Sequence, residues 1–222
     1  MIPYHDHSNE QVRVRLVDRM ATEAVALLSD AGTPLVSDPG YKLVRDARAA
    51  GRAVTTIPGP CAAIAAITLS GLPSDRFLFM GFLPAKTKAR TDTLTEVAGL
   101  RATLVFYESG PRCAASLADM AAVLGDRPAA LCREISKAYE ETLTGTLTEL
   151  AAACIQKEPR GEVVLVVGPP GERAAPEADE IDAALCEALE RLTVSQAAGE
   201  VARALGADRK ALYARAMELK GK

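Results

Sequence analysis

An apolar run, a turn-rich loop and then an amphipathic stretch recur through the first half of the chain, and this alternation constrains the fold most. The run AVALLS at 24–29 precedes the loop at 30–40, and the β-branched run AVTTI at 53–57 precedes a Pro-Gly-Pro turn. Strands that alternate with helices predict a parallel sheet in an α/β protein. We therefore expect an α/β chain whose first domain contains parallel strands at 24–29 and 53–57.

The pattern changes after residues 71–76. Short apolar runs then follow one another closely, with helical stretches at 111–124 and 147–156 among them. Closely spaced strands of this sort predict a mixed or antiparallel sheet. We expect two α/β domains, the first at 1–73 and the second at 74–170.

Three prolines and a glycine in and just before 171–176 predict a linker, because proline removes a backbone donor and ends regular structure. The segment 177–222 then predicts a helical C-terminal domain. Thr193 and Asp208 are suited to cap helices and Gly206 to end one. The spacing resembles a helix-turn-helix, and the alternative is a small packed helical appendage.

Composition excludes several classes of protein. The 222 residues are 49% hydrophobic and 25% charged, which excludes a disordered or collagen-like chain. No apolar run approaches the ~18 residues of a membrane span and the first residues are polar, so we expect a cytoplasmic protein with no membrane partner. Five cysteines without a CxxC pair and two histidines predict reduced thiols and no metal site. The net charge of −3 means that any nucleic-acid contact depends on local positive charge.

Two loops follow the predicted strands of the first domain. The first contains the sequence SDAGTP, and the second, PGPCA, leads into a helix. Ligands of α/β sheets bind outside the carboxyl ends of strands, where helix N-termini offer free N–H groups. Neither a G-x-G-x-x-G nor a Walker A sequence occurs, so the usual dinucleotide and phosphate fingerprints are absent. Asp38, before Pro39, is either a functional carboxylate or a helix N-cap.

Two further clusters are rich in charge. Tyr107, Glu108 and Ser109 end one predicted strand, and the sequence REISK at 133–137 follows another. So many charges suit the wall of a cleft better than a core, and the alternative is a salt-bridge strip on the surface.

These clusters, in this order, resemble the tetrapyrrole methylase superfamily and, within it, the ribosomal RNA small subunit methyltransferase I family. The resemblance covers essentially the whole chain. It rests on the stretches YHDHSNE, LLSDAGTPLVSDPGYKLV, IPGPCAAI, GLPSDRFLFMGFLPAK, LVFYES with Arg112, REISKAYEE and GEVVLVVG.

The resemblance implies a two-domain enzyme that binds S-adenosylmethionine between its domains. It also implies methylation of the ribose 2′-hydroxyl of a cytidine in the decoding region of small-subunit rRNA, as naked rRNA or in the assembled 30S subunit, by a homodimer. The cofactor site would be lined by Ser29, Asp30, Ala31, Gly32, Thr33, Cys61, Ala62, Tyr107, Glu108 and Gly161.

Two sets of residues complete the expected site. A ribose hydroxyl is a weak acid, so a carboxylate within hydrogen-bond reach would serve as general base, and the candidates are Asp38 and Glu134. Local positive charge would contact RNA phosphates without reading sequence. The candidates for these contacts are Lys86, Lys88, Arg90, Arg209, Lys210 and Arg215.

The chain departs from the family pattern in two ways. It begins after the family's Pro-(x)-Gly-Asn-Leu loop and Ala-Glu-Asp-Thr-Arg segment, so we expect a shortened first domain. Pro111 stands where the family commonly has histidine. Two alternative functions remain open at this point: a tetrapyrrole methyltransferase of the precorrin type, and a DNA-binding regulator with a ligand-sensing α/β domain.

Overall fold

The computed structural model describes residues 1–5, 9–171 and 178–220. The chain divides into two compact units, Met1–Pro170 and Gly171–Lys222. The domain boundary expected between residues 73 and 74 lies inside the first unit and stays a prediction. None of the described helices combines the length and the apolar character needed to cross a membrane.

A five-stranded mixed sheet organises the first unit. Its strands lie in the order β1-β2-β5-β3-β4, with β1 parallel to β2 and every other pair antiparallel. The mixed sheet expected from the closely spaced strands is therefore confirmed. The strands are β1 (Phe77–Phe82), β2 (Thr103–Ser109), β3 (Pro128–Arg133), β4 (Glu141–Thr146) and β5 (Glu162–Val167).

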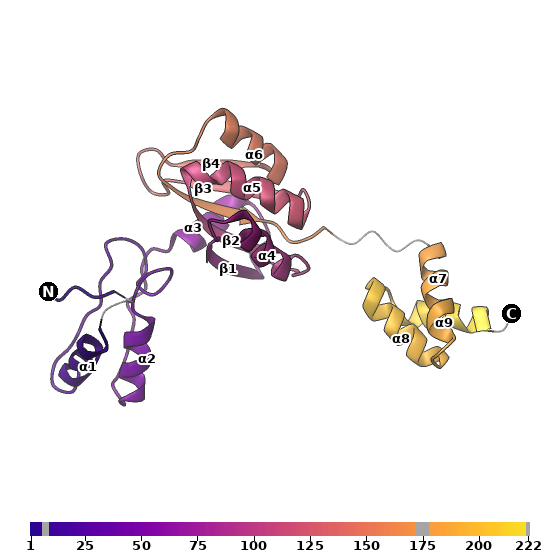
Figure 1. Cartoon of the computed structure of the whole chain (residues 1–222), viewed down its shortest axis with the longest axis horizontal. Helices are drawn as coiled ribbons and strands as arrows, with labels where there is room; N and C mark the ends of the chain where they lie inside the picture. Colours follow the sequence, from indigo (N-terminus) through magenta and orange to yellow (C-terminus); the bar gives the residue numbers. More distant parts are fainter. Residues whose placement is uncertain (6–8, 172–177, 221–222) are drawn as a thin grey trace. The chain divides into compact units, whose positions relative to one another are not determined.

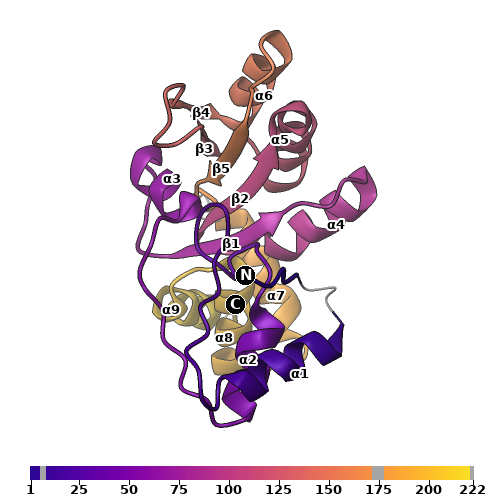
Figure 2. The ribbon, with the colours of Figure 1, turned by 90° about the vertical axis from the view of Figure 1, so that its left-hand side faces the viewer.

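Helices cover both faces of this sheet. Figure 2 shows α3 on one side and α4, α5 and α6 on the other. Alternate residues of the strands point to opposite faces, so Phe106 and Leu131 enter the core under α5 and α6, while Val105 and Cys132 pack against α3. The helices are α3 (Ala62–Ser70), α4 (Thr87–Val97), α5 (Gly110–Leu124) and α6 (Leu147–Gln156).

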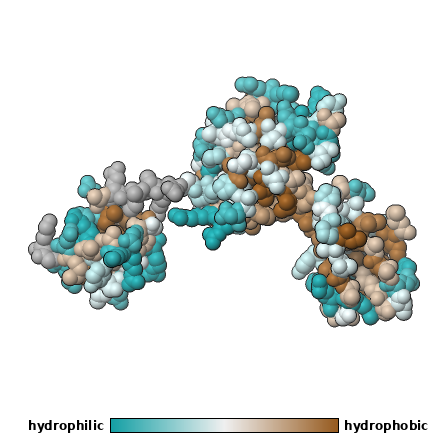
Figure 3. All heavy atoms as spheres, turned by 180° about the vertical axis from the view of Figure 1, so that it is seen from behind, coloured by the Kyte–Doolittle hydropathy of each residue, from teal (hydrophilic) through white to brown (hydrophobic). Residues whose placement is uncertain are grey.

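The face of the sheet that α3 covers stays partly apolar at its surface. Ile64 and Leu69 of α3 are 48% and 39% exposed. Figure 3 shows apolar side chains gathered on this rear side of the sheet-containing part. One short helix of small residues is too narrow to bury its own outer side chains.

The N-terminal segment packs around two helices, α1 (Glu10–Arg19) and α2 (Tyr41–Ala49), drawn in indigo and violet in Figure 1. Leu16, Val17, Leu43 and Ala47 form its small core.

The prediction of strands at 24–29 and 53–57 is wrong. Both runs lie outside helices and strands, and neither has a ladder partner among the described residues. Leu28 and Ile57 are 80% and 89% exposed. A β-strand is held by hydrogen bonds to a neighbouring strand, so an apolar β-branched run without that neighbour does not form one.

One glycine marks a tight approach in the first unit. A Cβ added to Gly110, the first residue of α5, would lie 1.8 Å from the carbonyl oxygen of Pro159. Backbone cannot move aside as a side chain can, so we expect Gly110→Ala to destabilise the protein by about 3 kcal/mol, at the upper end of the usual cost of overpacking. Urea unfolding measures this, with Gly99→Ala as the control because nothing lies within 4 Å of the added Cβ there. Equal stability of the two variants would contradict the close approach.

The buried thiols allow a second test. Cys113, Cys132 and Cys154 are buried and Cys186 is exposed, all as free thiols. Burial raises the pKa of the Cys113 thiol to about 12, so almost none of it is thiolate at pH 8. In a titration with a thiol reagent at pH 8, we expect Cys186 to react in the folded protein and Cys113 to react only after unfolding. Fast labelling of Cys113 in the native protein would contradict its burial.

The second unit is a three-helix assembly of α7 (Ala178–Leu189), α8 (Val194–Leu205) and α9 (Arg209–Lys220). Leu185, Val201 and Leu212 meet in its core. Three sequence predictions are confirmed here. Thr193 and Gln196 form a capping box, Gly206 ends α8 with φ of 67°, and Asp208 accepts a hydrogen bond from the Ala211 amide at 2.9 Å.

Candidate functional site

The two loops predicted to bind a ligand are joined in the structure. The Thr33 hydroxyl in the first loop (residues 29–33) donates to the carbonyl oxygen of Pro60 in the second loop (residues 58–62) at 2.9 Å. Within the first loop, the Ser29 hydroxyl donates to the Ala31 carbonyl at 3.0 Å. Gly32 has φ of 69° and open space where a Cβ would lie. The first loop therefore exposes its backbone, as ligand binding at this position requires.

The second loop leads directly into α3, whose N-terminus meets the end of β2. Cys61 is the N-cap residue and makes no side-chain capping bond. The amide of Ala63 in the first turn donates to the Tyr107 hydroxyl at 3.3 Å. The first turn of a helix carries unpaired N–H groups and the positive end of the helix dipole, so this end of α3 favours an anionic or hydroxyl group.

Tyr107 is also the centre of an aromatic cluster. Its ring lies 4.8 Å from the Phe79 ring and 5.6 Å from the Phe82 ring, edge to face in both cases. Burial raises the pKa of the Tyr107 phenol, with a smaller contribution from Cys61. The phenol stays protonated at neutral pH, which suits a hydroxyl that binds rather than exchanges protons.

Sequence reasoning missed Phe79 and Phe82. Residues three apart on a regular strand face opposite sides, so the two rings were not expected to meet. A register shift between Phe79 and Gly81, where Gly81 has φ of 64°, places both rings against Tyr107. The glycine within the apolar run FLFMGF was the available signal, because glycine inside a strand marks a bulge.

Asp38 lies in a loop that reaches β1. Helix α2 begins at Tyr41 with Gly40 as its N-cap residue, so the alternative that Asp38 caps a helix is wrong. Leu35 and Ser37 have positive φ values of 73° and 57°, which is uncommon for such residues and typical of functional loops. The adjacent Ser37 lies against β1, because a Cβ on Gly81 would be 3.2 Å from its hydroxyl oxygen. Burial is the main cause of the raised pKa of Tyr107, and the negative charge of Asp38 makes a small contribution to it.

Glu108 does not belong to the same cluster. Because strand residues alternate, its side chain points to the opposite face from Tyr107, where it is 3% exposed. Its carboxylate accepts from the Ser116 hydroxyl at 2.7 Å and the Ser109 amide at 2.9 Å. These bonds and Arg112, 3.2 Å away, hold the Glu108 side chain in the core as a structural group, so they disfavour a cofactor contact by this side chain, and the predicted role of Glu108 stays a prediction.

Glu134 and Gly161 contact each other at the start of β5, which pairs with the end of β2. A Cβ on Gly161, which has φ of 85°, would lie 2.2 Å from a Glu134 carboxylate oxygen. That oxygen accepts from the Glu162 amide at 3.0 Å and from Lys137 at 3.3 Å. The hydrogen bonds from the Glu162 amide and from Lys137 lower the pKa of Glu134. The carboxylate is therefore a weaker base, which disfavours the predicted catalytic role.

The predicted RNA contact of Arg90 in the first unit stays a prediction, and the structure disfavours it. Arg90 is 4% exposed, forms an ion pair with Asp119 and donates to the carbonyl oxygens of Pro84 and Ala85. Its guanidinium therefore fixes the start of α4 and is not available to a phosphate. Lys88 is exposed and forms an ion pair with Asp92 at 2.9 Å.

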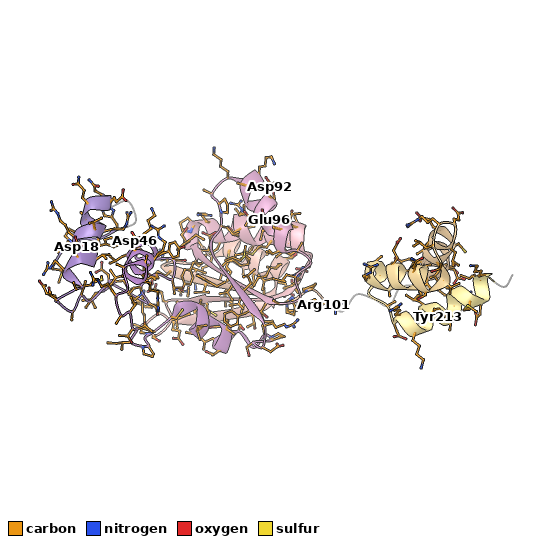
Figure 4. All side chains as sticks on the ribbon, turned by 90° about the horizontal axis from the view of Figure 1, so that it is seen from below. Asp18, Asp46, Asp92, Glu96, Arg101 and Tyr213 are labelled. Carbon is orange, nitrogen blue, oxygen red and sulfur yellow. The ribbon has the colours of Figure 1, made fainter. Side chains whose placement is uncertain are left out.

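The outer side of α4 also carries acidic side chains. Figure 4 shows Asp92 and Glu96 there. They reduce the positive potential of this surface, which leaves Lys86, just before α4, as the exposed predicted contact without an ion pair to a described residue.

The basic residues of the second unit also differ in availability. Arg215 bonds to both Asp182 and Glu218, which raise the pKa of its guanidinium. It therefore joins α7 to α9, and its predicted RNA contact is disfavoured. Arg209 donates to Ser195 at 3.3 Å, and Lys210 is exposed.

Comparison with known proteins identifies the class. Residues 3–151 match the tetrapyrrole (corrin/porphyrin) methylases, and residues 174–220 match the RsmI C-terminal HTH domain. The crystal structure of a conserved hypothetical protein from Aeropyrum pernix K1 matches this fold with a TM-score of 0.55 and 20% sequence identity. The match covers 94% of this chain and 74% of that protein. Uroporphyrin-III C-methyl transferase from Thermus thermophilus, solved with S-adenyl homocysteine, gives 0.50 at 20% identity, covering 74% and 75%. The match of residues 3–151, together with the fold, defines the chain as a tetrapyrrole methylase.

Sequence identity narrows the class to a family. The ribosomal RNA small subunit methyltransferase I of Erythrobacter litoralis is 55% identical over 217 residues, which cover 98% of this chain and 77% of that protein. The chain belongs to the ribosomal RNA small subunit methyltransferase I family. The resemblance that rested on seven motifs, the α/β fold and the helix-turn-helix at the C-terminus are thereby confirmed.

Proposed function

We propose that this chain transfers a methyl group from S-adenosylmethionine to the ribose 2′-hydroxyl of a cytidine in the decoding region of small-subunit rRNA. Family membership supports an rRNA methyltransferase, since the Erythrobacter relative bears that name. The proposal rests on two hydrogen bonds, from the Thr33 hydroxyl to the Pro60 carbonyl and from the Ala63 amide to the Tyr107 hydroxyl, which join three parts of the chain. We call this the three-part junction: the first loop, the second loop with the N-terminus of α3, and the end of β2.

The residues at the three-part junction fit the chemistry of S-adenosylmethionine. Free amides at the start of α3 suit a carboxylate, and the aromatic cluster offers apolar surface for an adenine. When bound, S-adenosylmethionine supplies a methyl group already activated by the sulfonium charge. The residues that would hold it are Ser29, Asp30, Ala31, Gly32, Thr33, Cys61, Ala62 and Tyr107.

Two contributions to the rate come from the chain itself. Holding a ribose oxygen in line with an activated methyl group can lower a barrier by up to about 7 to 11 kcal/mol. Asp38 would accept the proton of the ribose hydroxyl, because the adjacent Ser37 lies against Gly81 of β1 and Asp38 is not used as a helix cap. Glu134 is the weaker candidate, because its carboxylate already accepts hydrogen bonds from the Glu162 amide and from Lys137.

The RNA would be held by local positive charge in both units. Lys86 and Lys88 in the first unit and Arg209 and Lys210 in the second are the candidates that the contacts leave in reach of solvent. We further propose that the protein works as a homodimer, for which light scattering would give twice the chain mass of 23.4 kDa.

Methyl transfer to 30S subunits tests the proposed function. Subunits lacking the modification would be incubated with methyl-labelled S-adenosylmethionine, and the RNA digested to nucleosides for mass spectrometry. We expect label in 2′-O-methylcytidine alone, from a single site per subunit. Label on a base, or label in uroporphyrinogen but not in RNA, would overturn the assignment of substrate.

A further inference from the structure

A hollow in the first unit shares no lining residue with the three-part junction. It lies between the hairpin of β3 and β4, the end of α6 and the segment that enters β5, and its volume is about 920 Å³. That size is in the range of small-molecule and nucleotide sites. Its floor is apolar and its rim is polar: the lining includes Leu131, Leu143, Ala153, Cys154, Arg133, Glu134, Tyr139, Glu141, Lys157, Glu158, Arg160 and Gly161.

The rim carries a large aromatic side chain that does not pack in the hydrophobic core. Tyr139 is 75% exposed and belongs to none of the core clusters. It lies in the β3–β4 connection, where Glu134 and Ser136 have positive φ values of 50° and 63°. Strained residues of this kind persist where surrounding contacts hold them, here the bond from the Ser136 amide to Glu140 at 2.5 Å. Tyr139 is thus presented to solvent by an ordered connection.

The charges of the rim are only partly neutralised. Arg133 is paired with Glu141 at 2.6 Å, and Glu134 is paired with Lys137. Lys157 and Arg160 are exposed and form no close ion pair with any described residue. The bond from Arg133 is the main cause of the lowered pKa of Glu141, and the charge of Lys157 adds a small contribution. The lining as a whole is balanced, with the cations Arg133, Lys157 and Arg160 against the carboxylates Glu134, Glu141 and Glu158, so the available positive charge is local to Lys157 and Arg160. Tyr139, Lys157 and Arg160 line the same hollow, and proteins bind unpaired nucleotides with exposed aromatic rings and cations in one groove.

We propose that this hollow, the β3–β4 hollow, receives an unpaired nucleotide of the RNA substrate, with its base stacked on Tyr139 and phosphates beside Lys157 and Arg160. The inference rests on the proposed function, because it assigns a second contact to the same substrate. It also gives Glu134 and Gly161 a role as lining residues of the hollow, where Glu134 accepts a hydrogen bond from the Glu162 amide at 3.0 Å.

Binding of a fluorescent single-stranded RNA octanucleotide to the full chain tests this inference. Stacking on an aromatic side chain is worth about a 5- to 150-fold change in affinity, so Tyr139→Ala should weaken binding by that amount and Tyr139→Phe should not. Removing both cations, Lys157→Ala with Arg160→Ala, should reduce the slope of log K against log salt by about 1.4. Arg101→Ala is the matched control, an exposed cation of the same unit that lies outside the hollow, and should leave the slope unchanged (Figure 4).

Photocrosslinking locates the RNA directly. An octanucleotide with 4-thiouridine should crosslink to peptides within 133–143 or 153–161, as mapped by mass spectrometry. Crosslinks confined to the second unit, or an unchanged affinity of Tyr139→Ala, would overturn the inference. So would weaker binding of Tyr139→Ala to 30S subunits with unchanged binding to RNA, because that result indicates a ribosomal protein as the partner. Methyl transfer to 30S subunits is measured separately, so failure of the proposed function is distinguishable.

Discussion

Asp38→Asn is expected to lower the rate of methyl transfer by about 10²- to 10⁴-fold, the range for loss of a general base. Asparagine keeps the size of the side chain and removes its ability to take a proton. The first loop and the N-terminus of α3 are unchanged, so affinity for S-adenosylmethionine should stay within a few-fold of the original. Single-turnover kinetics with 30S subunits measure the rate, and calorimetry measures the affinity.

The matched control is Asp18→Asn. Asp18 is an exposed carboxylate on α1, and Figure 4 shows it with Asp46 in the part of the chain that contains α1 and α2. Its replacement should leave both quantities unchanged. A fully active Asp38→Asn enzyme would contradict the assignment of the base, and Glu134→Gln would then be the next variant to measure.

Arg90→Ala is expected to destabilise the protein by about 3 to 5 kcal/mol, as loss of one partner from a buried ion pair does. The side chains of Arg90 and Asp119 are only 5% and 21% exposed. The substitution leaves the Asp119 carboxylate and the Ala85 carbonyl oxygen without their donor, while the Pro84 carbonyl oxygen keeps a bond from Arg112. The melting temperature should fall by about 10 °C, given about 2 to 4 °C for each kcal/mol at this chain length.

Lys88→Ala is the control for the same helix. The side chains of Lys88 and Asp92, which form its ion pair, are 87% and 61% exposed. Ion pairs this exposed contribute about 0 to 1 kcal/mol to the free energy of unfolding. The melting temperature of this variant should therefore match that of the unchanged protein. If Arg90→Ala instead kept its stability and lost affinity for RNA, the original prediction of a phosphate contact would be right.

The sequence was most informative where local chemistry decides the structure. Proline, glycine and small residues after apolar runs predicted both loops of the three-part junction, because few other residues allow such turns. Thr193, Gly206 and Asp208 were likewise predictable, since capping depends on neighbouring backbone groups. Tyr107 was predicted because it ends a buried run.

The sequence was least informative where a contact depends on residues distant in the chain. Arg90 reads as part of a basic loop, and only the fold brings Asp119 to it, 29 residues later. The strands expected at 24–29 and 53–57 failed for the same reason, because a ladder partner cannot be read from the run itself. Glu108 and Tyr107 differ in the face of the strand to which they point, and the pattern of alternation could have separated them.

Hydrogen exchange with and without S-adenosylmethionine, followed by mass spectrometry, tests the central claim most directly. If the cofactor is held at the three-part junction, amides in peptides covering 29–33 and 61–64 should exchange more slowly when it is bound. Peptides of α4 and of the second unit should be unaffected. Unchanged exchange at both loops, or slowing confined to the β3–β4 hollow, would contradict the account.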